Sequence, residues 1–86
     1  MSKLAPIAGT VVAATGAAHF VAPQAFASIN QAAFPQNTGE WIKRNGATEL
    51  ALGLGLLSRR TRKLAAVGLV AYSAFLGSRV AANRKG

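Results

Sequence analysis

The feature that most constrains this chain is the separation of its charged residues from its apolar ones. No permanently charged residue lies at positions 4–39 or 64–78, and Glu49 is the only one within 45–58. The basic residues stand at the edges of these stretches, most densely at positions 59–63. A soluble amphipathic helix carries polar residues along one face. Apolar blocks with basic ends are instead typical of a membrane protein.

The composition agrees with this interpretation and excludes several classes of protein. Charged residues make up 14% of the 86 residues, against about 25% in an average soluble domain. There is no Cys, so disulfides and thiolate sites are excluded. The two acids and one His are too few for most catalytic constellations. We therefore expect a protein that is not an enzyme and has no cofactor.

The three blocks predict an all-α fold, an integral membrane helical bundle with three transmembrane helices in a single domain, 1–86. The first apolar block, residues 4–21, has 18 residues, roughly 27 Å as a helix, close to the hydrocarbon thickness of about 30 Å. We place the spans at about 4–22, 41–58 and 63–82. The last two spans are short, and we expect them to pack against each other as a helical hairpin.

The segment between the first two spans predicts a short helix at about 23–34, lying on the membrane surface. Pro23 fits the first turn of a helix, where its missing N–H costs nothing. Phe26, Ile29 and Ala33 form a weak apolar stripe. The turn that follows ends at Thr38, which we expect to cap the next helix.

The basic loop at 59–63 predicts the orientation, since short basic loops stay cytoplasmic. The N-terminus would then lie inside, and residues 23–40 and the C-terminus outside, in a multi-pass protein of a bacterial inner (plasma) membrane. An alternative remains open. Lys3, the first apolar run and Ala25-Phe26-Ala27 also resemble a signal peptide with its cleavage site.

Small residues recur at four-residue spacing in every span, which permits close helix packing in lipid. The first span offers a ridge of Gly9, Ala13 and Ala17 with Gly16 nearby. For the other two spans we expect the partner-binding residues to be Ala47, Ala51 and Gly55, and Ser73 and Gly77. Such ridges suit a compact bundle and suit docking against other integral membrane subunits.

His19 and Glu49 are the two titratable groups inside the apolar blocks, and an acid within a span marks a function or a specific partner. We expect Glu49 to bond Asn45, Thr48 or His19 within the bundle. A metal site would need three or four ligands, so we predict none. Nucleic acid is not an expected partner. We expect the basic loop of Arg59, Arg60, Arg62 and Lys63 to contact anionic lipid headgroups or a cytoplasmic partner.

Several short motifs resemble one known family. They are His19-Phe20-x-x-Pro23-x-x-Phe26, Phe34-Pro35, Asn45-Gly46-Ala47-x-Glu49-Leu50-x-Leu52-Gly53-Leu54-Gly55-Leu56-Leu57 and Arg59-x-x-Arg62-x-x-Ala65-Ala66. Together they resemble the DoxX-like family of small bacterial membrane proteins. Members usually have four membrane helices, whereas this chain would have three. The resemblance therefore implies a lateral face that a partner could fill.

The resemblance implies two functions. One is a non-catalytic accessory subunit of a larger inner-membrane complex in lipid or solute transport. The Ala-, Gly- and Arg-rich composition resembles that of actinobacteria, for which a lipid importer of the Mce type is one candidate. The other is an integral subunit of a quinone-linked oxidoreductase, with His19 and Glu49 near the quinone headgroup. A small self-associating membrane protein is a third hypothesis.

Overall fold

The structure, a computed structural model, describes residues 3–84. Within this range the chain is helical and contains no strand, which confirms the all-α class. The elements are α1 (Leu4–Val21), a short 3-10 helix η1 (Pro23–Phe26), α2 (Ala27–Ala33), α3 (Thr38–Leu57) and α4 (Arg62–Arg84). The molecule is elongated, with extents of 43 × 26 × 16 Å.

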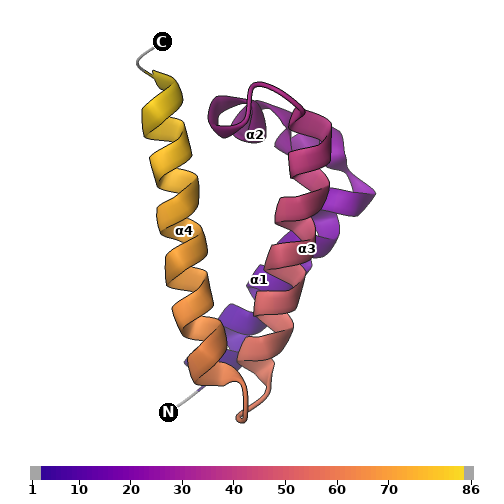
Figure 1. Ribbon diagram of the computed structural model, residues 1–86. Helices are drawn as coiled ribbons and strands as arrows, with labels where there is room; N and C mark the ends of the chain where they lie inside the picture. Colours follow the sequence, from indigo (N-terminus) through magenta and orange to yellow (C-terminus); the bar gives the residue numbers. More distant parts are fainter. Residues whose placement is uncertain (1–2, 85–86) are drawn as a thin grey trace.

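The three long helices alternate in direction. The start of α1 and the α3–α4 loop lie at one end of the molecule, and α2 and the last turn of α4 lie at the other (Figure 1). The helices α3 and α4 diverge from their shared loop. The short α2 lies between their far ends, which makes the arrangement a V that is closed at its wide end.

Glycines bring α1 and α3 into backbone contact. A Cβ on Gly16 would lie 2.6 Å from the carbonyl oxygen of Gly46, and one on Gly53 would lie 2.6 Å from the Cα of Ala13. Real Cβ atoms do not approach this closely. Gly9 lies opposite Gly53 at the other end of the contact. Both helices thus pack through glycines that are seven residues, or about two turns, apart.

The turn before α3 begins differently from the sequence expectation. Asn37 is the N-cap and adopts the left-handed conformation, with φ of 61°. Asn tolerates this region better than most residues. Thr38 already belongs to the helix, and its Oγ1 donates a hydrogen bond to the carbonyl of Phe34 at 2.7 Å. The prediction of Thr38 as the cap was wrong. A capping residue precedes the first residue of the helix, whereas Thr38 is that first residue.

The other end of α3 is closed by side chains from the basic loop. Thr61 Oγ1 donates to the carbonyl oxygen of Gly55 at 2.7 Å, and Arg62 Nε donates to that of Leu56 at 2.8 Å. These donors satisfy carbonyls that have no partner within the helix. The positive charge of Arg62 also suits the negative end of the helix dipole.

Two helices, α1 and α4, are long and apolar enough to cross a membrane. Only 6% of the apolar window of α4 is buried, so α4 is not the buried core helix of a soluble protein. The helix α1 lies near the N-terminus, and a signal sequence there would have the same length and apolar composition. The helix of the second predicted span, α3, is not among the candidates, because it carries Glu40, Lys43, Arg44 and Glu49.

Candidate functional site

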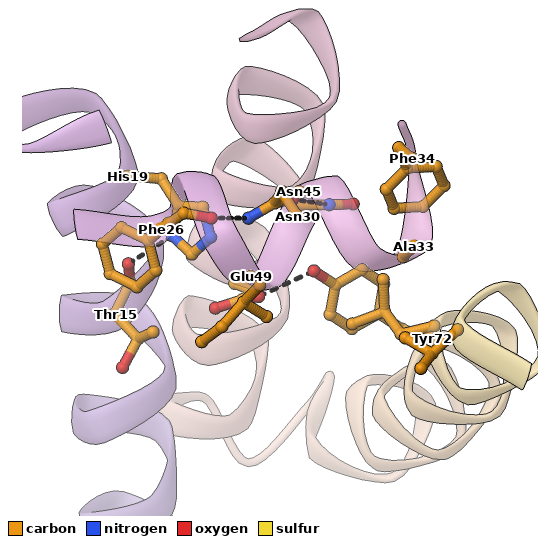
Figure 2. Close-up of a pocket in the computed structure, with 12 residues that line it drawn as sticks. Thr15, His19, Phe26, Asn30, Ala33, Phe34, Asn45, Glu49 and Tyr72 are labelled. Atoms are coloured by element: carbon orange, nitrogen blue, oxygen red, sulfur yellow. Dashed lines mark hydrogen bonds between the residues drawn. The ribbon is translucent and has the colours of Figure 1, made fainter. Parts of the chain in front are cut away.

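A cavity of about 210 Å³ lies inside the V, where α1, α3 and α4 meet the η1–α2 segment (Figure 2). All of the long helices contribute to its lining. Its walls are mostly apolar, with Phe26, Ile29, Leu76 and Val80 among them. Six polar side chains also line it, and they are Thr15, His19, Asn30, Asn45, Glu49 and Tyr72.

His19 comes from the last turn of α1 and is buried, with 4% of its surface exposed. Its Nδ1 lies 2.8 Å from the carbonyl oxygen of Thr15. Because a carbonyl only accepts, this contact requires a proton on Nδ1 and leaves Nε2 as an acceptor in the neutral ring. The ring stacks on Phe26 with the centroids 3.9 Å apart. His19 therefore fixes η1 against the end of α1.

Asn30 and Asn45 join α2 to α3. Asn45 Nδ2 donates to Asn30 Oδ1 at 2.6 Å, and Asn30 Nδ2 donates to the carbonyl oxygen of Phe26 at 2.9 Å. Both amides are buried, each with 4% exposed. Paired amides avoid the cost of burying unsatisfied polar groups. The pair sets the position of α2 over the cavity.

Glu49 and Tyr72 join α3 to α4. The Tyr72 hydroxyl donates to Glu49 Oε2 at 2.7 Å, as the dashed line in Figure 2 shows. Sequence reasoning expected Asn45, Thr48 or His19 as the partner, and each of these makes a different hydrogen bond. Tyr72 was missed. It is the only Tyr in the chain and lies in the middle of the third apolar block, which was the available signal.

The cavity brings His19 and Glu49 together on one lining, although no hydrogen bond joins them among residues 3–84. His19 Nε2, Asn45 Oδ1 and Glu49 Oε1 are acceptor atoms on this lining that make no hydrogen bond within the described residues. Over the same range, no group of three or more His, Cys, Asp or Glu side chains is placed to hold a metal ion. The arrangement can thus tie helices together and receive a hydrogen-bond donor.

The predicted docking ridges occupy three different environments. Ala47 is exposed and takes no part in the glycine contact with α1. Ala51 and Gly55 line a second hollow between α3 and α4, and a Cβ on Gly55 would lie 2.9 Å from that of Ala65. Ser73 and Gly77 are exposed on α4, and a Cβ on Gly77 would meet no atom within 4 Å.

The basic loop divides into two parts. Arg62 is half-buried and caps α3, as described above. Arg59, Arg60 and Lys63 are exposed. The exposed three remain free for the predicted contact with headgroups or a cytoplasmic partner.

Residues 8–86 match the family model described as "Domain of unknown function (DUF8561)". The chain belongs to the DUF8561 family. No curated protein and no solved structure matches it. Since the matched range includes all six polar cavity residues, the site lies within the part of the chain that defines this DUF8561 domain. The resemblance to the DoxX-like family stays a prediction.

Proposed function

We propose that this DUF8561 protein is a multi-pass protein of the bacterial inner membrane. It acts as a non-catalytic accessory subunit of a larger complex, and a lipid or solute transporter is the complex we favour. Its mechanism is the packing of its membrane helices against those of partner subunits. The observation that carries the proposal is α4, a helix apolar enough to cross a membrane with only 6% of its apolar window buried.

The distribution of apolar side chains supports a lipid environment. Five apolar residues are buried, whereas twelve large ones are exposed among the described residues. The exposed set includes Leu64 at 75%, Val67 at 67% and Val70 at 71% along α4. A soluble monomer rarely exposes such a continuous apolar surface. Lipid tails or partner helices would cover this surface and keep it out of contact with water.

The polar groups within the helices also suit lipid. Thr10 and Thr15 donate to the carbonyls four residues earlier, at 2.8 Å each, so neither hydroxyl needs water. Every fully buried side-chain nitrogen or oxygen within residues 3–84 has a partner. For α3 to span as well, Lys43 and Arg44 would extend toward the headgroups beside its first turns.

The small residues on the outer face of α4 give this proposal a direct test. Replacing Gly77 with Leu fills a position where no neighbouring atom lies within 4 Å, so the chain's own fold should be unchanged. A partner helix packed there would be displaced, because close approach depends on small residues. Gly55→Leu is a poorer test, since Gly55 contacts Ala65 within the chain.

The experiment is a mild-detergent pull-down of the tagged chain from its native membranes, with mass spectrometry of what co-purifies. We expect wild type and the control Gly39→Leu, another glycine with open space around it, to retain transporter subunits, and Gly77→Leu to lose them. Recovery of the chain alone, or only with itself, would overturn the accessory role and favour self-association. Release by carbonate extraction would overturn the integral membrane assignment.

A subunit of a quinone-linked oxidoreductase is the second candidate. The cavity favours it, because His19 and Glu49 line one mostly apolar space of about 210 Å³. If this candidate is correct, redox subunits co-purify, and Glu49→Gln lowers quinone-dependent activity while assembly is retained. Normal activity of the Glu49→Gln complex would exclude it.

A further inference from the structure

The end of the molecule opposite the basic loop carries an aromatic cluster. Phe34 and Trp41 stack with their centroids 4.1 Å apart and their planes within 8°. Phe75 of α4 lies 5.8 Å from Phe34 and 6.0 Å from Trp41. The cluster joins the α2–α3 turn to α4. Trp at such a position is typical of the interface between the hydrocarbon and the headgroups.

Two guanidinium groups flank this cluster. Arg44 lies 5.0 Å from the centroid of Trp41, and Arg79 lies 5.6 Å from that of Phe34. Arg44 is already paired with Glu40 at 3.1 Å. Arg79 pairs with no carboxylate among residues 3–84, where Glu40 pairs with Arg44 and Glu49 accepts from Tyr72. The charge of Arg79 is therefore available to an anion.

A hollow of about 270 Å³ lies beside Arg79, lined by Phe34, Pro35, Gln36, Trp41, Arg79 and Asn83. Asn83 shapes it, since its Nδ2 donates to the carbonyls of Ala33 and Arg79 at 2.7 and 2.8 Å. These bonds fix the last turns of α4 against α2. Gln36 and the indole N–H of Trp41 add neutral donors that make no hydrogen bond within the described range.

We propose that this hollow binds the phosphate of an anionic phospholipid. This rests on the proposed membrane location. The planar guanidinium of Arg79 would hold two phosphate oxygens, which is the geometry that favours Arg at phosphate sites. Arg79 would lie at the depth of the lipid phosphates, because it directly follows the uncharged stretch 64–78. A lipid places its phosphate at the point where an apolar span ends.

The surrounding charge selects an anionic headgroup over a zwitterionic one. This end of the molecule carries Lys43, Arg44, Arg79 and Arg84 against the single acid Glu40. The positive excess attracts a headgroup with net negative charge. It would repel the terminal ammonium of a zwitterionic headgroup.

The test uses the full chain purified in a neutral detergent, with equal amounts of phosphatidylglycerol and phosphatidylcholine of matched tails. Native mass spectrometry gives the ratio of the two bound lipids. We expect phosphatidylglycerol to be preferred, and Arg79→Gln to lower the ratio about fivefold, the factor for about 1 kcal/mol per basic residue near the headgroups. Arg79→Lys keeps the charge and should lose less.

The control is Lys3→Gln, which removes one exposed charge at the opposite end, outside the basic loop expected to contact headgroups, and should change the ratio less than twofold. Equal binding of the two lipids by wild type would overturn the proposal, as would equal losses in the two Gln variants. An excess of free inorganic phosphate that removes the lipid preference would indicate a site for a soluble anion instead. If carbonate extraction releases the chain, the proposed membrane location fails. A chain that stays in the membrane without lipid preference refutes only the headgroup site.

Discussion

The glycine contact between α1 and α3 gives the sharpest prediction for stability. A Cβ added at Gly53 would lie 2.6 Å from the Cα and 2.7 Å from the Cβ of Ala13. Carbon atoms prefer about 3.5–4.0 Å, so the helices would have to separate by roughly 1 Å. Separation forfeits contact along the whole interface, and overpacking of this kind costs about 1–3 kcal/mol.

The matched control is Gly77→Ala, since a Cβ at Gly77 meets nothing within 4 Å. Both variants gain the same helix propensity, roughly 1 kcal/mol, so the difference between them isolates the steric effect. We expect Gly53→Ala to be less stable than Gly77→Ala by about 1–3 kcal/mol. The free energy of unfolding can be followed in mixed micelles by the fluorescence of Trp41, the only Trp. Equal stability of the two variants would refute the backbone contact.

Three further predictions concern the polar contacts. Tyr72→Phe should destabilise the chain by about 0.6 kcal/mol, the average for hydrogen bonds between membrane helices. It should add nothing to Glu49→Leu, which removes the acceptor, if the two side chains act as a pair. Additive losses in the same unfolding assay would contradict that pairing. Asn45→Leu should cost about 1–3 kcal/mol because it leaves the buried Oδ1 of Asn30 without its donor. The double change Asn30→Leu with Asn45→Leu should cost less than Asn45→Leu alone, and a larger loss would argue against the pairing. Thr61→Ala should cost about 0.5–1.5 kcal/mol and speed proteolytic cleavage of the loop, and an unchanged cleavage rate would count against the cap.

The approximate positions of the long helices were predictable from the sequence, because each contains an apolar run bounded by turn-forming or basic residues. The predicted spans at about 4–22, 41–58 and 63–82 compare with helices at 4–21, 38–57 and 62–84. Each uncharged block ends where basic or turn-forming residues begin, and a continuous apolar run of this length has few alternatives to a helix. Helix limits therefore depend on local sequence.

The packing faces were harder to predict, because α3 carries small residues on more than one face. The expected ridge began at Ala47, whereas the contact with α1 uses Gly46 and Gly53. The spacing of seven residues in Gly46 and Gly53 matches that of Gly9 and Gly16. That match between two segments was the available signal. Four-residue spacing within one segment could not choose the face.

The hydrogen-bond partner of Glu49 could not be predicted from the sequence either, because it depends on where α4 lies. The half-buried stripe of α4 includes Leu69, Tyr72, Leu76 and Val80, a helical repeat that becomes visible only once one face is known to point inward. The local sequence around Glu49 gives no indication of a contact with Tyr72, which lies 23 positions away. Long-range contacts of this kind follow from the V shape of the whole chain.

The two halves of the V are held by different kinds of contact, and this bears on the cavity. The α1–α3 half is locked by backbone contact at four glycines. The α4 half is held by the bond from Tyr72 to Glu49, the bond from Asn83 to the Ala33 carbonyl and the aromatic cluster. A backbone contact cannot adjust without separating the helices, whereas a few side-chain bonds can reorient. Because Tyr72 also lines the cavity, any displacement of α4 changes the size of the cavity while the α1–α3 half stays intact.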